Sequence, residues 1–310
     1  MSKSIGLLFG MERTFPAALS EEIGRRAKGA VSCEGFRIGA LRPDRPPRYD
    51  VILDRISHEV PYYRTTLKQC CFQGIDVINN PFWFAADDEY FGNLVAEKAG
   101  VAVPKTVLLP HKKHPPNTFA ESFTNLRFPL EWEEVFDYLG FPIFMKPSSG
   151  GGWKNVSRCT GPEEFFRAYE ESGDLCMMAQ EEIVFTEYFR CYTLGRERVH
   201  VMRYDPKSPH HLRYVRDPAP VDPALHEKIE RDCVAICRGL GYDFNTAEFA
   251  IRDGVPYAID FTNPCPDADV HSVGEANFAW IVKNAAELLI ERAREPRPFE
   301  MTGDWVEQLR

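Results

Sequence analysis

The chain has 310 residues, of which 44% are hydrophobic and 27% charged, so it is typical of a globular protein with two or three lobes. A formal net charge of −9 argues against general binding to nucleic acid or anionic membranes, and no apolar run approaches the roughly 20 residues of a membrane span. The nine cysteines are scattered and form no metal-ligand set, which favours free thiols in a reducing cytoplasm.

Strand and helix patterns alternate over the first hundred residues. The expected strands are 5–9, 49–53 and 76–78, and the expected helices are 15–26, 62–73 and 90–99. The first apolar run is typical of a strand and not of a signal peptide. The alternation indicates a parallel sheet, in which ligands bind at the carboxyl ends of the strands. Arg55 and His58 follow the second strand, so they are either substrate contacts or surface polar residues.

Residues 141–156, FPIFMKPSSGGGWKNV, join a lysine to a run of small residues. Lys146 is followed by Ser148, Ser149, Gly150, Gly151 and Gly152. Glycine loses the most conformational freedom on folding, so three in a row indicate a ligand that needs close approach of the backbone. A phosphate chain held by N–H groups is the commonest such ligand. On the glycines alone, a flexible surface turn fits as well.

The remainder of the chain continues with strands, helices and loops. The Pro-rich, basic segment 110–116 and the segment 264–278, which follows Asn263, are predicted to be loops. The expected strands lie at 101–110, 141–146 and 175–183, in a hairpin over 191–204 that turns at Gly195, and in a hairpin over 245–264; the expected helices are 162–171 and 224–240.

The second hairpin, NTAEFAIRDGVPYAIDFTNP, carries an acid on each strand. If its loop has three residues, Ile251 pairs with Val255, and Glu248 and Asp260 share one face. A two-residue loop would put the two acids on opposite faces. Two carboxylates with Asn263 just beyond would suit Mg²⁺, which is commonly held by one or two carboxylates and the phosphates of a substrate. The alternative is a hairpin with solvated acids on its outer face.

The order of these motifs resembles the ATP-grasp superfamily, whose lobes hold ATP between two antiparallel sheets. The similar segments are YDVILDR and GIDVINNP (its Rossmann-like lead-in), VAVPKT (the entry to the ATP-binding part), FMKPSSGGGWKNV (its lysine and phosphate loop), AQEEI (the hinge at adenine), EYFRCYTLG (the next strand) and EFAIRDGVPYAIDFTNP (the metal hairpin). The resemblance covers most of residues 50–290 and is nearest to glutathione synthetase and the ribosomal-protein glutamate ligases.

The resemblance implies an α/β (α+β) fold in three parts. These would be a Rossmann-like pre-ATP-grasp domain over 1–103, a small lobe with the phosphate loop over 104–183, and a large lobe with the metal hairpin over 184–310.

The resemblance also implies two bound groups, ATP and Mg²⁺, and residues for each. The implied ATP contacts are Lys105, Lys146, Ser149 and Gly150 to Gly152 at the phosphates, Gln180 and Glu181 at adenine, Glu182 and Ile183 through the hinge backbone, and Glu187 at the ribose. Glu248, Asp260 and Asn263 would hold Mg²⁺. Arg190 and Arg203 would be catalytic, because positive charge near the transferring phosphoryl group is a large catalytic effect.

The sequence departs from the family pattern in three places. Many relatives carry a lysine before the ATP lobe, where this chain has Asp88 and Glu89. The metal motif is usually Glu-x-Asn, whereas Asp260 and Asn263 are three residues apart. Either the strand bulges or Thr262 takes the position of the amide. The first metal ligand is usually an aspartate, and Glu248 is one methylene longer.

The function that the resemblance implies is an ADP-forming carboxylate–amine ligase, in which ATP phosphorylates a carboxylate and an amine attacks the acyl phosphate. A kinase acting on a hydroxyl and a nucleotide-binding protein without catalysis are the alternatives. The expected partners are small-molecule carboxylates and amines, and a homodimer is left open. Residues suggested for the substrates are His200, His210, His211, Arg213 and Arg216, which form either a binding cluster or a solvated loop, and Asp267, Asp269 and His271 near the amine site.

Overall fold

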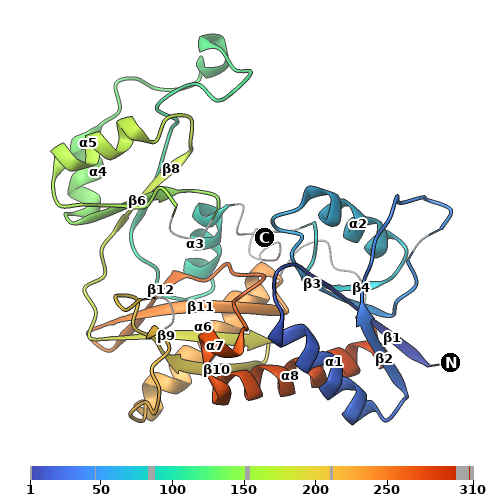
Figure 1. The fold of residues 1–310 in the computed structure, drawn as a ribbon. Coiled ribbons are helices and arrows are strands. Elements are labelled where there is room, and N and C mark those ends of the chain that lie inside the picture. Colours follow the sequence, from blue (N-terminus) through green and yellow to red (C-terminus); the bar gives the residue numbers. More distant parts are fainter. Residues whose placement is uncertain are drawn as a thin grey trace.

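The computed structural model of the chain describes residues 2–45, 47–82, 88–150, 154–209, 212–297 and 307. Over these ranges the chain forms three four-stranded sheets with helices packed against them (Figure 1). This arrangement is a mixed α/β fold, as predicted from the sequence. Gly151, Gly152, His210 and His211 lie outside the described residues.

The first sheet is parallel and has the order β2-β1-β3-β4. Its elements are β1 (Lys3–Phe9), α1 (Thr14–Ala27), β2 (Val31–Gly35), β3 (Val51–Arg55), α2 (Pro61–Phe72) and β4 (Asp76–Ile78). The predicted parallel sheet is therefore confirmed. Strand β2 was not predicted, because it lies at the sheet edge and only Val31 of its five residues is buried.

The second sheet is antiparallel, with the order β5-β8-β6-β7. Its elements are β5 (Thr106–Leu109), the 3₁₀ helix η2 (Ala120–Phe123), α4 (Trp132–Leu139), β6 (Ile143–Pro147), β7 (Ser157–Cys159), α5 (Pro162–Glu171) and β8 (Met177–Glu181). Met145, Phe165 and Met177 belong to the core between this sheet and its two α-helices. Because side chains alternate along a strand, Phe144, Lys146 and Gln180 face the other way.

The third sheet is also antiparallel, with the order β10-β9-β11-β12. Its strands are β9 (Glu187–Leu194), β10 (Arg198–Arg203), β11 (Phe244–Arg252) and β12 (Val255–Asp260), and helices α3 (Glu89–Lys98) and α6 (Pro223–Leu240) cover one face. Gly195 stands at the turn between β9 and β10 with a φ of 65°, as predicted. Figure 1 shows the second sheet above the third, and the first sheet to the side.

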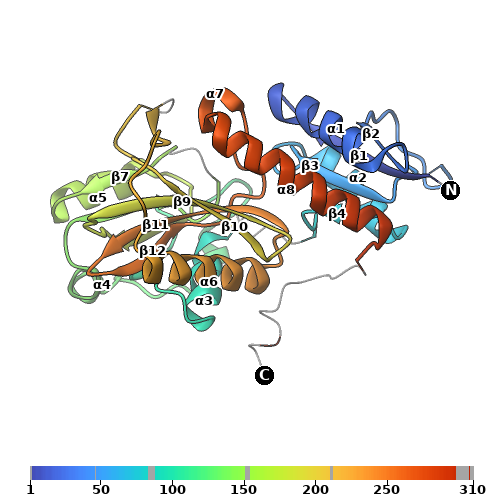
Figure 2. The same cartoon turned by 90° about the horizontal axis from the view of Figure 1, so that it is seen from below.

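The predicted loop over 264–278 is non-helical only as far as residue 269 and is mostly helical after it, so the prediction is wrong for its second part. That part forms α7 (Val270–Val273) and the start of the long helix α8 (Glu275–Arg294). The side chain of Asp269 accepts a hydrogen bond from the His271 N–H and so caps α7. Helix α8 runs along both the first and the third sheets (Figure 2).

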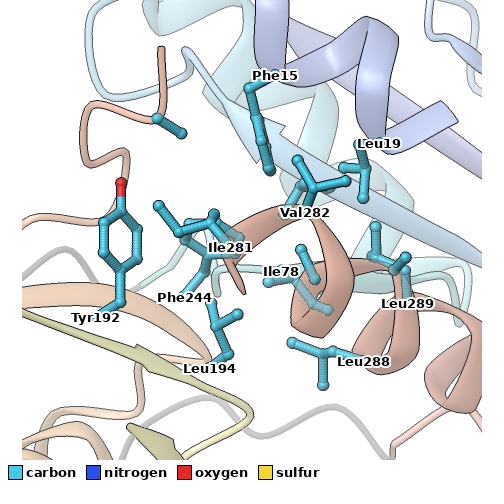
Figure 3. Close-up of a cluster of buried hydrophobic side chains, with 14 of the residues drawn as sticks. Phe15, Leu19, Ile78, Tyr192, Leu194, Phe244, Ile281, Val282, Leu288 and Leu289 are labelled. Atoms are coloured by element: carbon cyan, nitrogen blue, oxygen red, sulfur yellow. The ribbon is translucent and has the colours of Figure 1, made fainter. Parts of the chain in front are cut away.

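The apolar face of α8 joins the first and third sheets into one core. Ile281 and Leu288 of α8 belong to the same buried cluster as Phe15 of α1 and Leu194 of β9 (Figure 3). Helix α3 similarly packs against α6, although the predicted domain boundaries separate the two. Those boundaries stay a prediction. None of the helices in the described ranges has the length and apolar character that a membrane crossing requires.

Candidate active site

The acidic hairpin β11–β12 ends in a two-residue turn, so the predicted three-residue loop is wrong. Arg252 pairs with Val255, which leaves Asp253 and Gly254 as the turn. Both turn residues have positive φ, 54° and 73°, and Asp-Gly is a favoured sequence for such turns. Taken alone, this turn would have placed the two predicted metal ligands on opposite faces of the hairpin.

A β-bulge brings the two acids together. Phe249 pairs with Ala258, but the next pair along is Glu248 with Asp260, so Ile259 is an extra residue on β12. The extra residue shifts the alternation of side chains by one position and cancels the effect of the short turn. Glu248 and Asp260 consequently line the same cavity, as predicted, although the register that brings them there differs from the one expected.

A cavity of about 530 Å³ lies between the second and third sheets. It is lined by residues of α3, β6, the segment between β6 and β7, the segment after β8, the loop after β10 and the third sheet. The predicted site residues among them are Lys146, Ser149, Gly150, Gln180, Glu181, Glu182, Ile183, Glu248 and Asp260. The structure therefore gathers most of the predicted phosphate, adenine and metal residues around one space.

Lys146 forms an ion pair with Glu89, one of the two acids that stand where many relatives carry a lysine. Its Nζ lies 2.8 Å from Oε2 of Glu89. The Glu89 N–H also donates to the carbonyl oxygen of Ser148, at 2.8 Å. Burial raises the pKa of Glu89, an effect that Lys146 opposes and Asp260 adds to. The start of α3 is thus held against the strand and loop that carry the predicted phosphate ligands.

Glu248 is buried and hydrogen-bonded through both carboxylate oxygens. Nη1 of Arg190 lies 2.5 Å from Oε1, and the Tyr188 hydroxyl donates to Oε2 at 2.6 Å. Burial raises the pKa of Glu248, while Arg190 lowers it and Asp260 raises it further. Arg190 faces the same side of the sheet because it pairs directly with Glu248 in the β9–β11 register.

Asn263, and not Thr262, lies beside Asp260. Its Nδ2 donates to Oδ1 of Asp260 at 2.8 Å and to the carbonyl oxygen of Thr246 at 3.4 Å. Because the amide hydrogens take part in these two hydrogen bonds, the amide oxygen is the part of the side chain that can coordinate a cation. Thr262 packs near Gly92 of α3, where a Cβ would lie 3.5 Å from its methyl carbon. Glu248 and Asp260 line the cavity and present the carboxylate oxygens that Mg²⁺ prefers, whereas Asn263 lies next to Asp260 and is not among the lining residues.

In the described ranges, no three His, Cys, Asp or Glu side chains are grouped closely enough to hold a metal ion.

Arg203 and Glu187 lie on the far side of the third sheet, which corrects both predictions. They form an ion pair of 2.6 Å, and the Arg203 guanidinium lies 5.2 Å from the centre of the Phe189 ring. Phe189 pairs with Arg203 in the β9–β10 register and belongs to the core beneath α6. Arg190, one residue further along β9, faces the opposite side because side chains alternate.

Lys105 also points away from the cavity. Its Nζ donates to the carbonyl oxygen of Tyr138 in α4, at 3.0 Å, behind the second sheet. The prediction that this side chain contacts the phosphates is therefore corrected. Its backbone contacts a predicted adenine ligand, because the Lys105 N–H donates to Oε1 of Glu181 at 3.0 Å.

The hinge acids are held by other residues of the chain. Arg158 forms an ion pair with Glu182 at 2.7 Å, and Arg252 lies 3.4 Å from Glu181. The Glu182 N–H donates to the carbonyl oxygen of Pro142 at 3.1 Å, so the backbone contact predicted for Glu182 does not have this N–H free.

The residues suggested for substrates are dispersed. Arg55 is buried, bonds to Glu12 and to a backbone carbonyl, and lies 5.1 Å from the centre of the Phe15 ring, so it serves as an internal ion pair. His200 stacks on Trp280 of α8 at 4.7 Å. Burial lowers the pKa of His200.

The other suggested groups bond locally. Arg213 donates to the carbonyl oxygen of Ser208, and Asp267 accepts from the Asp269 N–H. The proposed cluster of histidines and arginines therefore does not form among the described residues, because His200 lies against α8 and not beside Arg213.

Sequence reasoning missed several cavity residues, and three of them carry polar or charged groups of interest. Lys154 follows the glycine run closely, and its position in that stretch was a usable signal. Tyr188 and Lys207 also line the cavity. Lys207, which lies 5.2 Å from the centre of the Phe185 ring, belongs to a loop with no motif, so only the folded chain brings it there.

No protein-family model matches the sequence, and no curated protein matches it either. Several solved structures do match over almost the entire chain. One is D-alanine–D-alanine ligase from Bacillus anthracis complexed with ATP, with a TM-score of 0.64 and 15% identity over 96% of this chain and 100% of that one. Another is VanG D-Ala:D-Ser ligase from Enterococcus faecalis, with a TM-score of 0.65 and 16% identity over 94% of this chain and 100% of that one. A third is a RimK domain ATP-grasp protein from Sphaerobacter thermophilus, with a TM-score of 0.64 and 15% identity over 93% of this chain and 99% of that one.

The chain has the ATP-grasp fold. At these identities the likeness is one of fold, and it confirms the predicted fold class. In this fold, the cavity between the two antiparallel sheets corresponds to the place where the sequence resemblance put ATP.

Proposed function

We propose that this protein is an ATP-dependent, ADP-forming carboxylate–amine ligase that works through an acyl phosphate. The observation that carries the proposal is the cavity between the two antiparallel sheets, where Lys146 lies on one wall and the opposed Glu248 and Asp260 on another. The fold shared with a D-alanine–D-alanine ligase, a D-Ala:D-Ser ligase and a RimK domain ATP-grasp protein supports it by analogy. The volume of the cavity suits a small-molecule ligand, for which sites of about 300–1,000 Å³ are usual.

The proposed nucleotide is ATP, with the phosphates at Lys146, Ser149 and Gly150 and the base at the hinge. One of the similar ligases has been solved in complex with ATP, which supports this assignment. Lys146 leaves Glu89 and pairs with phosphate oxygens, since an ammonium group can turn on its flexible stem. Lys154 and Lys207 add positive charge at the cavity wall.

The proposed metal ligands are Glu248, Asp260 and Asn263. When bound, Mg²⁺ would neutralise charge on the transferring phosphoryl group. Arg190 holds Glu248 in place for this task. Arg190 is not among the lining residues but bonds to Glu248, which is, and its buried Nε–H has no acceptor among the described residues; we propose that it donates to an oxygen of the acyl phosphate.

The proposed reaction has two steps. The γ-phosphoryl group passes to an oxygen of a substrate carboxylate, giving ADP and an acyl phosphate, and an amine then displaces phosphate to form an amide. We propose small-molecule carboxylate and amine substrates and a cytoplasmic location; all nine cysteines are free thiols, which accords with that compartment. The similar ligases act, by name, on D-alanine and D-serine.

A hydroxylamine screen tests the proposal. Hydroxylamine replaces the amine and traps an acyl phosphate as a hydroxamate, so a panel of amino acids, dipeptides and other small carboxylates should contain members that give ATP-dependent hydroxamate together with ADP and phosphate. The Asp260→Asn variant serves as the inactive control. Transfer of phosphate to a substrate hydroxyl, without free phosphate, would replace the ligase by a kinase.

Arg190→Lys is expected to lower turnover about 10- to 100-fold while ATP binding changes little, because lysine cannot reproduce the guanidinium contacts to Glu248 and to a developing oxyanion. Arg203→Lys is the matched control, since it makes the same replacement one strand away on the opposite face. Its turnover should equal that of the wild type. Equal losses in both variants would contradict the assignment of Arg190.

A further inference from the structure

A chain of two hydrogen bonds determines the orientation of the amide group of Gln180. The Thr106 hydroxyl donates to the carbonyl oxygen of Pro104 at 3.0 Å, and Nε2 of Gln180 donates to Oγ1 of Thr106, also at 3.0 Å. Thr106 and Gln180 are paired across β5 and β8. Both therefore project from the same face of the second sheet, the face that borders the cavity.

The orientation follows from counting protons. A carbonyl oxygen only accepts, and a threonine hydroxyl has one proton to donate. Because that proton goes to Pro104, Oγ1 of Thr106 can only accept from Gln180. The NH₂ group of Gln180 must then face Thr106, and its carbonyl oxygen Oε1 is the part left for a ligand in the cavity. The reversed amide would lose one of the two hydrogen bonds.

The neighbouring acids leave Gln180 as the group suited to contact the base. The carboxylate of Glu181 accepts from the Lys105 N–H, and that of Glu182 is held by Arg158. Gln180 is only 3% exposed, so its side chain cannot turn out into solvent. A buried polar atom with a fixed role imposes a strong preference on its partner, because a mismatched ligand leaves it unpaired.

We infer that Thr106 is a positioning residue that selects 6-amino over 6-oxo purine nucleotides by holding Oε1 of Gln180 toward the base. The inference rests on the proposed nucleotide site. Adenine carries an amino group at position 6, which donates a hydrogen bond, whereas the 6-oxo group of hypoxanthine or guanine accepts one and meets an acceptor here. Thr106 acts through Gln180 and needs no contact with the nucleotide.

Calorimetric titration of ATP and inosine triphosphate, each with Mg²⁺, tests this inference. The two nucleotides share their phosphates and ribose and differ only in the six-membered ring of the base, at the group on position 6 and the protonation of the adjacent N1. Thr106→Val keeps the shape of the side chain and removes the hydroxyl, so the Gln180 amide is free to reverse. The ratio of ATP to inosine triphosphate affinity should fall about tenfold, with the inosine nucleotide gaining affinity.

Thr106→Ser is the matched control, because it retains the hydroxyl and should retain the wild-type ratio. An equal loss of affinity for both nucleotides in Thr106→Val would show a purely structural role and overturn the inference. A wild-type protein that binds both nucleotides equally would overturn it while leaving the nucleotide site intact. If the wild type binds neither, the proposed function itself fails.

Discussion

Lys146→Ala is expected to weaken ATP binding about 10- to 100-fold while the protein remains folded, since hydrogen bonds to charged groups contribute about 1.5–3 kcal/mol. The lysine projects from β6 toward the cavity and away from the core of its sheet, so its loss removes charge without opening a packing defect. Binding is measured by calorimetry with ATP, and folding by thermal denaturation.

The pairing of Lys146 with Glu89 calls for a second variant. Removing the lysine leaves the Glu89 carboxylate unpaired beside the phosphate site, and its repulsion would weaken binding by itself. In Lys146→Ala combined with Glu89→Gln, this repulsion is absent. Binding should recover only in part. Full recovery would show that the lysine makes no contact with phosphate, and unchanged binding in Lys146→Ala alone would contradict the whole phosphate site.

Asp260→Asn is expected to lower turnover by at least about 1,000-fold, because a bound metal ion supplies several kcal/mol of stabilisation to the transferring phosphoryl group. ATP binding measured without Mg²⁺ should change little, and the gain in affinity on adding Mg²⁺ should disappear. The substitution keeps the size of the side chain and its place opposite Glu248 in the β11–β12 register. Turnover is followed as ADP release with a carboxylate found in the hydroxamate screen.

Asp253→Asn provides the control on the same hairpin. It makes the identical chemical change in the exposed turn, where the backbone has a φ of 54° and asparagine is well tolerated before glycine. Its turnover and Mg²⁺ dependence should match those of the wild type. Wild-type turnover in Asp260→Asn would remove the carboxylate from the proposed mechanism, and equal losses in both variants would point to the hairpin fold as the cause.

The features that could be predicted correctly from the sequence are those set by short, local patterns of residues. Alternating strands and helices predicted the parallel first sheet, and Gly195 marked the turn between β9 and β10. The lysine, the small-residue loop and the hinge segment came to one cavity as expected, because each is a short segment attached to a strand of regular geometry. Apolar periodicity and turn chemistry act over a few residues, so they can be recognised without the fold.

The face of the sheet from which each side chain projects was decided by the tertiary structure. Arg203 and Lys105 belong to correctly predicted strand regions, yet both point away from the cavity, since a shift of one residue reverses every side chain of a strand. Glu248 and Asp260 meet only because a bulge at Ile259 compensates a two-residue turn. Asp253-Gly254 is a recognisable sequence signal for the turn, whereas the bulge appears only when β12 pairs with β11. Lys207 and Glu89 reach the cavity from segments distant in sequence.

The sequence by itself determined the kind of fold and the chemical groups that the site contains, because strand periodicity and motif order are local properties of the chain. The tertiary structure decided which of those groups face one another. Register, bulges and the packing of α8 across two sheets depend on contacts between residues far apart in the chain. These contacts form only when the whole core is assembled, so the register and the facing of side chains cannot be recognised in any short segment of the sequence.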